Sequence, residues 1–145
     1  MTREEREAFL SDVRIGVLSV DNNGRGPLSI PMWYYYNRGE DIWMTTGENT
    51  RKGKLLKKAK RIGFCVQDET APYKYVSMEG PFTIDNSDTN SILEDTLKLA
   101  HRYLGKEGGD AYFNAMKEFM ISSGPLRLKF RPEHWLTFDA SKQAI

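Results

Sequence analysis

Alternating apolar and polar residues predict β-strands over much of this chain. Between residues 27 and 36, one set of alternate positions is apolar or aromatic: Leu28, Ile30, Met32, Tyr34 and Tyr36. A period of two is typical of a strand with one buried face. Similar runs cover residues 14–20, 42–46, 62–67, 75–84 and 126–138, and the stretches DNNGRG and NRGED separate the first three strands. We expect six or so short strands with hairpins at these two turns, and a bulge or sheet edge at Gly80-Pro81.

Capping signals predict one helix near the N-terminus and another in the middle of the chain. Thr2 with Glu5 forms a capping box, so a short helix should run to about Leu10. Thr50 is a natural N-cap, and the residues after it follow the period of an amphipathic helix. The apolar side of this helix carries Leu55, Ala59 and Ile62, and the opposite side carries Lys54, Lys57, Lys58 and Arg61.

Two further helices are predicted before the last strands. Ser91 with Glu94 forms another capping box. The helix that it opens has an apolar side made of Leu93, Leu97 and Leu104. The glycine-rich stretch GKEGG should end this helix. Asp110 can then cap a final helix that stops before SSGP.

These elements indicate a mainly β (α+β) fold, a small antiparallel barrel with peripheral helices, in a single domain over residues 1–145. The stretches between strands are too short for the repeated crossover helices of a parallel sheet. With 39% hydrophobic and 28% charged residues, the composition is that of a globular protein. No apolar run is long enough to span a bilayer, the polar start does not resemble a signal peptide, and the lone cysteine excludes an internal disulfide. We therefore expect a cytoplasmic protein without a membrane partner.

Positive charge is concentrated in one short stretch. The chain carries 21 Lys and Arg against 20 Asp and Glu, yet residues 51–61 hold seven basic residues and no acidic one. The other 134 positions hold 14 basic and 20 acidic residues. Arg51 and Lys52 fall in the first turn of the helix predicted after Thr50. Because the helix dipole already places about half a positive charge there, each cation costs about 0.3–1 kcal/mol.

A bound anion would explain cations at a helix start. Backbone N–H groups, the Thr50 hydroxyl and the two cations would converge on a phosphate. Hydrogen bonds to charged groups contribute about 1.5–3 kcal/mol each, which exceeds the cost from the dipole. A solvated helix face is the plain alternative. Nucleic acid is a third explanation, since Trp33, Tyr35 and Trp43 could stack bases, but the acidic remainder of the chain disfavours it and we expect no nucleic-acid partner.

The segment from the predicted third strand to the basic helix resembles the cofactor-phosphate motif of the pyridoxamine 5'-phosphate oxidase-like proteins. The residues are WMTT, a short glycine-containing turn and TRKGKLL. YVSMEGPFTI is similar to the VEG strand of that family, and Trp135 to its late tryptophan. The resemblance spans about residues 5–138. It implies a split antiparallel β-barrel of the FMN-binding type, usually a homodimer with the cofactor at the subunit interface.

The resemblance also implies cofactor-binding residues. Those expected at the phosphate are Arg51, Lys52, Thr50 and, nearby, Lys57. Those expected at the ring are Met44 and Thr45, with Pro31, Met32 and Trp33 packing their backbone against it; Trp33 could equally serve core or dimer packing. Tyr75, which replaces a Gln of the oxidase proper, and Trp135 complete the set. Those expected to reach across the dimer are Tyr73, Lys74 and Trp135.

One departure from the family narrows the expected function. The oxidase proper has a downstream Arg-Leu-His-Asp-Arg segment that grips the substrate phosphate, whereas this chain ends in LTFDASKQAI. We therefore do not expect a true pyridoxamine phosphate oxidase. The opening REEREAFLSDVRIGVLSVDNNGRGPLSIPMWY resembles the short flavin or deazaflavin oxidoreductases, which pass hydride between the cofactor ring and a small conjugated substrate. The expected cofactor is FMN, with coenzyme F-420 as the alternative, because the extra lysines would suit its acidic oligoglutamate tail.

The sequence contains no convincing catalytic constellation. This suits a flavin enzyme, because the isoalloxazine ring does the redox work while the protein holds and tunes it. His101 and His134 have no Cys or His partner at metal-binding spacing, so no metal is expected. A flavin-binding carrier or sensor without a dedicated substrate is the alternative function.

Overall fold

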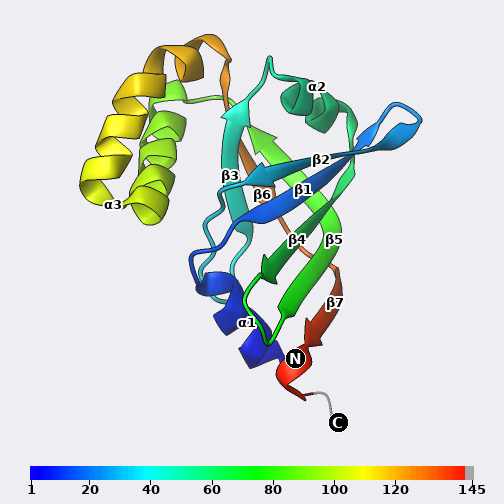
Figure 1. Ribbon diagram of the computed structural model, residues 1–145. Helices are drawn as coiled ribbons and strands as arrows, with labels where there is room; N and C mark the ends of the chain where they lie inside the picture. Colours follow the sequence, from blue (N-terminus) through cyan, green and yellow to red (C-terminus); the bar gives the residue numbers. More distant parts are fainter. Residues whose placement is uncertain (143–145) are drawn as a thin grey trace.

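The computed structural model describes residues 1–142. It shows a curled antiparallel sheet with three α-helices around it (Figure 1). The elements are α1 (Arg3–Ser11), β1 (Gly16–Asn22), β2 (Arg25–Met32), β3 (Ile42–Gly47), α2 (Arg51–Lys58), β4 (Arg61–Asp68), β5 (Lys74–Asp85), α3 (Thr89–Ser122), β6 (Pro125–Phe130), β7 (His134–Asp139) and a 3-10 turn, Ala140–Lys142. The mainly β architecture with peripheral helices is confirmed. The last three positions of the domain predicted for residues 1–145 lie outside the described residues.

Strand β5 joins the two halves of the barrel. The strand path is β2-β1-β4-β5-β6-β3, with β7 paired to β5 off this path. The first part of β5 pairs with β4 as far as Pro81, and the part from Phe82 onward pairs with β6. The register with β4 is unbroken up to its last pair at Pro81, so the bulge considered there was wrong. The other side of β5 is unpaired at Gly80-Pro81, between the ladder with β7 and the ladder with β6, which agrees with the alternative of an edge. Gly80-Pro81 marks the point where β5 passes from one half of the sheet to the other.

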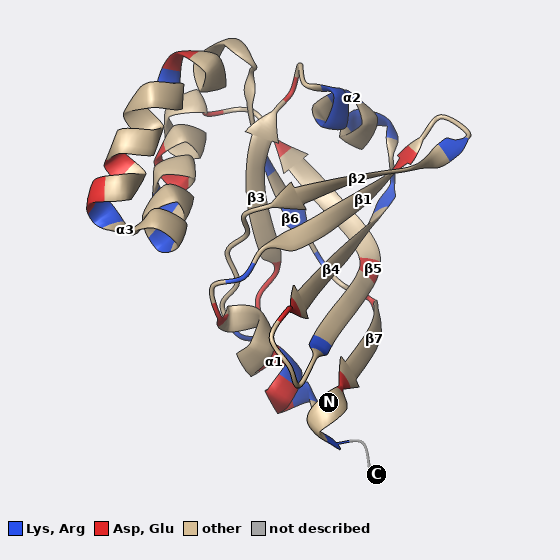
Figure 2. Ribbon diagram, in the orientation of Figure 1, with Lys and Arg blue, Asp and Glu red and all other residues tan. Residues whose placement is uncertain are grey.

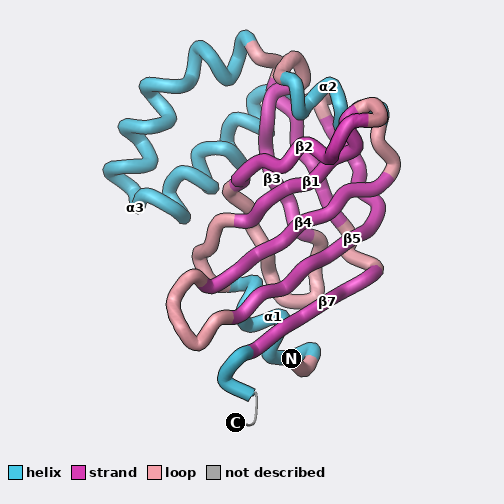
Figure 3. Tube along the Cα trace, turned by 45° about the vertical axis from the view of Figure 1, so that its right-hand side comes forward, coloured by secondary structure: helices cyan, strands magenta, loops and turns pink. Residues whose placement is uncertain are grey.

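The core fills the inside of the curled sheet, and α1 closes one end (Figures 1 and 3). Phe64 packs edge-on against Tyr34, with ring centroids 5.4 Å apart, and against Phe130 at 6.3 Å. The Tyr34 hydroxyl donates a hydrogen bond of 2.8 Å to the Leu10 carbonyl on α1. Gly16 leaves room for this arrangement, because a Cβ there would lie 2.0 Å from the Phe64 ring. The capping box that starts α1 is confirmed.

Helix α2 begins as predicted but ends earlier. Thr50 is its N-cap, and Ala59 leaves the helix with extended backbone (φ −76°, ψ 152°). The predicted continuation through Ile62 was wrong because Arg61 and Ile62 already pair with β5 as part of β4. The buried side of α2 is consequently short, and besides Gly53 it is formed by Leu55 and Leu56.

Helix α3 is a helical hairpin beside β3 (Figures 1 and 3). Its N-cap is Asp88, whose carboxylate accepts from the Ser91 N–H at 3.1 Å, so the predicted start at Ser91 was wrong. The predicted break is confirmed at Gly105, which has positive φ (77°). Asp110 lies inside the second half and contacts His101 at 2.6 Å instead of capping a helix. Leu104 is exposed, and the side chains that α3 buries are those of Ile92, Leu93, Leu99 and Ala100.

Candidate functional site

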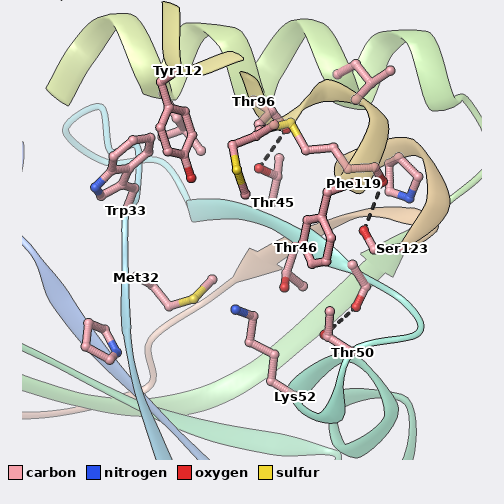
Figure 4. Close-up of a pocket in the computed structure, with 17 residues that line it drawn as sticks. Met32, Trp33, Thr45, Thr46, Thr50, Lys52, Thr96, Tyr112, Phe119 and Ser123 are labelled. Atoms are coloured by element: carbon pink, nitrogen blue, oxygen red, sulfur yellow. Dashed lines mark hydrogen bonds between the residues drawn. The ribbon is translucent and has the colours of Figure 1, made fainter. Parts of the chain in front are cut away.

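A pocket of about 390 Å³ lies between the end of β2, strand β3, the start of α2 and both halves of α3 (Figure 4). Small-molecule sites commonly measure about 300–1,000 Å³. The apolar or aromatic lining residues are Pro31, Met32, Trp33, Leu93, Leu99, Tyr112, Met116, Phe119, Met120 and Pro125. The remaining lining residues are Thr45, Thr46, Gly47, Thr50, Lys52, Thr96 and Ser123.

The start of α2 is fixed against the end of β3. The Thr50 hydroxyl donates to the Gly47 carbonyl at 2.7 Å and accepts from the Gly53 N–H at 3.1 Å. A Cβ at Gly53 would lie 2.0 Å from the Gly47 carbonyl oxygen, so only glycine allows this approach. The backbone N–H groups of Arg51 and Lys52 have no acceptor within residues 1–142. These donors therefore remain free at the positive end of the helix dipole.

Lys52 is the charged side chain of the pocket wall. It is half-buried, and burial lowers the pKa of its ammonium group. Across the part of the chain that the structure describes, this ammonium has neither a hydrogen bond nor an ion pair. Figure 4 shows it rising from α2 toward the pocket below Thr46. A half-buried ammonium without a counter-ion is unfavourable, and an anion in the pocket would offset that cost.

The other cations predicted at the phosphate are engaged elsewhere. Arg51 does not line the pocket, and its guanidinium donates to the Asn22 amide oxygen at 2.5 Å, at the end of β1. Lys57 forms an ion pair with Glu48, and this contact holds the pKa of Glu48 below its usual range. Figure 2 shows the basic residues of α2 gathered at one end of the barrel. Of the predicted phosphate residues, the structure brings Thr50 and Lys52 together in the pocket.

The residues predicted to contact the ring also divide into those that line the pocket and one that does not. Pro31, Met32, Trp33 and Thr45 line the pocket. Met44 does not line it, because neighbouring residues of a strand point to opposite faces and its side chain is fully buried in the core. A contact between Met44 and a cofactor stays a prediction. Thr46 was not predicted and also lines the pocket.

The second half of α3 supplies a wall that the sequence analysis missed. Tyr112, Met116, Phe119, Met120 and Ser123 all line the pocket. Their spacing is that of one face of a helix, and this apolar face was a signal that could have identified them. What it faces was not evident, since the opposite wall is formed by residues between Pro31 and Lys52, far earlier in the chain.

Tyr75 and Trp135 lie away from this pocket. Tyr75 is stacked on Phe138, with ring centroids 5.6 Å apart, on the outer face of the sheet. The Arg6 guanidinium covers the Trp135 ring at 3.6 Å, beside α1. Their predicted roles require a second subunit, so those roles stay predictions.

Residues 1–142 contain no cluster of three or more His, Cys, Asp or Glu side chains that could hold a metal ion. No helix among the same residues has the length and apolar character needed to cross a membrane.

Solved structures of several proteins share this architecture. A conserved hypothetical protein of Mycobacterium tuberculosis matches with a TM-score of 0.73 and 22% identity, over 97% of this chain and 86% of its own. An F-420 reductase matches with a TM-score of 0.68 and 20% identity, over 90% of this chain and 94% of its own. A Listeria innocua protein provisionally described as a pyridoxamine 5'-phosphate oxidase matches with a TM-score of 0.65 and 13% identity, over 95% of this chain and 98% of its own.

Comparison by sequence adds nothing further. No protein-family model matches the chain, and no curated protein matches it. At identities below a quarter, the structural matches establish the fold and leave the activity open. The chain has the split β-barrel fold of the pyridoxamine 5'-phosphate oxidase-like proteins.

Proposed function

We propose that this protein is an oxidoreductase that binds FMN, or alternatively coenzyme F-420, in the pocket beside α2. The cofactor's phosphate would lie against the Lys52 ammonium and the free N–H groups at the start of α2. Thr50, whose hydroxyl donates to the Gly47 carbonyl, would hold this helix start in place beside the phosphate. Its flat ring would extend along Thr45 and the backbone at Pro31–Trp33. The bound ring would supply the hydride chemistry, exchanging hydride with a small conjugated substrate.

The unpaired Lys52 ammonium carries this proposal. It is half-buried and borders a pocket that no carboxylate of the described residues lines, and the free N–H groups of the helix start lie next to it. These features suit one compact anion attached to a larger flat group. Arg51 supports the site indirectly, because its bond to Asn22 ties the start of α2 to β1.

Two features separate the candidate cofactors. FMN ends at its phosphate, whereas coenzyme F-420 continues into an acidic oligoglutamate tail. Lys54 and Lys58 are exposed on the outer side of α2, where such a tail could reach them. The solved F-420 reductase shares the fold, which keeps this alternative open. A true pyridoxamine phosphate oxidase activity is not proposed.

The proposal includes a homodimer formed through the outer face of β1, β4, β5 and β7. A row of paired residues crosses this face: Val17, Cys65, Ser77 and Leu136. Leu136 is 63% exposed and Val17 37% exposed, and the stacked Tyr75 and Phe138 lie in the next row. A second copy would cover this apolar surface and would bring Tyr75 to the subunit interface.

The proposal is tested by identifying and measuring the bound cofactor. The protein is purified, whatever it carries is released, and the molecule is identified by absorption spectrum and mass. FMN and coenzyme F-420 are then titrated into the wild type, Lys52→Met and Lys58→Met. Because hydrogen bonds to charged groups contribute about 1.5–3 kcal/mol, Lys52→Met should lower affinity about 10- to 150-fold. Lys58→Met removes the same charge from an exposed position and should leave FMN affinity within about twofold.

The outcomes discriminate between the functions. Unchanged FMN affinity in Lys52→Met rejects the phosphate assignment. Tight cofactor binding without turnover of any quinone or enone favours the carrier or sensor function. Steady oxidation of the reduced cofactor by such acceptors supports the oxidoreductase.

A further inference from the structure

The second half of α3 forms a wall whose chemistry limits what the pocket accepts. It presents Tyr112, Met116 and Phe119 to the pocket opposite the start of α2 (Figure 4). Phe119 is 58% exposed and Tyr112 37% exposed, so both rings still offer surface to a ligand. Aromatic and thioether side chains favour flat, polarisable, apolar groups.

The charge of the pocket lining also limits which ligands the pocket accepts. Among residues 1–142, no Asp, Glu, His or Arg lines the pocket, and Lys52 is its one charged residue. An organic cation would meet an ammonium group of the same sign with no carboxylate to balance it. Neutral molecules and anions avoid this penalty. If the anionic group of the cofactor occupies Lys52, the remaining apolar space suits a neutral ligand.

Two hydroxyls interrupt the apolar wall, those of Tyr112 and Ser123, and the Ser123 hydroxyl already donates to the Met120 carbonyl at 2.9 Å. Figure 4 shows the Tyr112 ring beside Trp33 with its hydroxyl directed into the pocket. The two ring centroids are 5.1 Å apart. Within residues 1–142 this hydroxyl has no hydrogen-bond partner, so its proton is free for a ligand.

Tyr112 packs against Trp33, and Trp33 is itself held in place by Tyr103. Trp33 stacks flat on Tyr103, with ring centroids 5.1 Å apart and an interplanar angle of 8°. The Tyr103 hydroxyl donates to the Arg14 carbonyl at 2.5 Å and accepts from the Tyr34 N–H at 3.0 Å. Burial raises the pKa of Tyr103, so it remains a neutral donor. Trp33 is therefore fixed, and it provides a rigid surface against which the Tyr112 ring rests.

We propose that Tyr112 is the residue that recognises the second ligand of this site, by donating a hydrogen bond to a carbonyl oxygen. The ligand is a neutral, flat, hydrophobic molecule with a ring carbonyl, held against Met116 and Phe119. This inference rests on the proposed function, in which such a molecule is the hydride acceptor or donor. The competing explanation is that Tyr112 serves only to pack against Trp33.

A matched pair of ligands separates these explanations without any turnover. 1-Tetralone and tetralin share a fused two-ring skeleton, and only 1-tetralone has a carbonyl. Binding of each is measured by calorimetry or by chemical-shift titration to the protein as purified, with any cofactor that it carries. A net hydrogen bond of about 0.5–1.5 kcal/mol predicts that the wild type binds 1-tetralone about 2- to 13-fold more tightly than tetralin. Tyr112→Phe should lose this preference while its affinity for tetralin stays the same.

A spectroscopic measurement reports the same bond directly. The infrared carbonyl stretch of 1-tetralone labelled with carbon-13 should move to lower wavenumber in the wild type. It should return toward the value of the unbonded ketone in Tyr112→Phe. Tyr35→Phe is the control, because the Tyr35 ring is stacked on Trp43 and lies outside the pocket lining.

The outcomes keep this inference separate from the proposed function. A preference for 1-tetralone that survives in Tyr112→Phe overturns the role of Tyr112, even if FMN binds through Lys52. A preference lost in Tyr112→Phe but kept in Tyr35→Phe supports it, even if neither FMN nor coenzyme F-420 binds to the wild type. In that second case the oxidoreductase proposal fails and the carbonyl-binding site remains.

Discussion

The hydroxyls of Thr45 on β3 and Thr96 on α3 lie 2.9 Å apart, and their hydrogen bond joins the barrel to the helical hairpin beneath the pocket. The Thr96 hydroxyl also lies 2.9 Å from the Ile92 carbonyl. Since a hydroxyl has a single proton, Thr96 donates to that carbonyl and accepts from Thr45. Both residues line the pocket, so this bond fixes the distance between β3 and the first half of α3 where they border it.

Replacing Thr45 with valine should loosen this connection. Val keeps the branched shape and removes the donor, so the free energy of unfolding should fall by about 0.5–1.5 kcal/mol. Urea unfolding followed by circular dichroism measures the change. Thr83→Val is the control, because Thr83 is exposed on β5 and makes no side-chain hydrogen bond within the described residues. Equal effects of the two changes would mean that the Thr45–Thr96 bond contributes nothing.

Gly53 tests how closely α2 must approach β3. In Gly53→Ala the new Cβ would meet the Gly47 carbonyl oxygen at 2.0 Å, and backbone atoms cannot move aside cheaply. We expect a loss of about 1–3 kcal/mol in unfolding free energy and weaker FMN binding, because the helix start would shift away from the pocket. Gly26→Ala is the matched control, since nothing lies within 4 Å of a Cβ there. Retained stability and FMN affinity in Gly53→Ala would show that the helix start tolerates displacement.

Local signals made much of this fold predictable. The hairpin turn at DNNGRG, the capping box at Thr2 and the N-cap at Thr50 each depend on residues within one turn of the chain. The end of α2 was not predictable in this way. Residues 59–62 continue the helical pattern, but the helix ends at Lys58 and β4 begins at Arg61, because Arg61 and Ile62 pair with Pro81 and Gly80 on β5. A long-range pairing overrode a local preference there.

The sequence pointed to the part of the pocket at the start of α2 and did not predict the wall formed by the second half of α3. The TRKG stretch directed attention to the start of α2, where Thr50 and Lys52 line the pocket. Sequence could not distinguish Arg51 from Lys52, because the difference depends on Asn22, which is 29 residues away and holds the Arg51 guanidinium. Tyr112 lies still further along the chain. Its place opposite Lys52 follows from the break at Gly105, which folds α3 back on itself.

The proposed dimer predicts which exposed apolar residue matters for assembly. Leu136→Asp should convert a dimer into a monomer, because it would place a charge on the sheet face that the proposed dimer buries. Sedimentation velocity over a range of protein concentrations measures the change. Ile121→Asp is the control, since Ile121 is 48% exposed on α3, away from that face. A wild-type monomer, or a dimer that Leu136→Asp leaves intact, would contradict the proposed interface.

The lowered pKa of Lys52 makes phosphate binding dependent on pH. Burial disfavours the charged ammonium in the free protein, so Lys52 loses its proton at a lower pH than an ordinary lysine. Below that pKa the ammonium is charged and binds an anion. As the pH rises through the pKa, the charge and the affinity are lost together. A phosphate monoester gains its second negative charge near pH 6, so FMN affinity should first rise with pH and then fall on the alkaline side.

Two variants assign the alkaline fall to Lys52. Lys52→Arg keeps a positive charge at every accessible pH, so it should bind FMN without the alkaline fall. Lys52→Met should bind weakly and likewise lack it. Titration calorimetry of the wild type on that alkaline limb, in buffers of different ionisation enthalpy, should show proton uptake, because a bound anion raises the pKa of the ammonium beside it. An alkaline fall that persists unchanged in Lys52→Arg would place the titrating group elsewhere and would leave Lys52 without a role in anion binding.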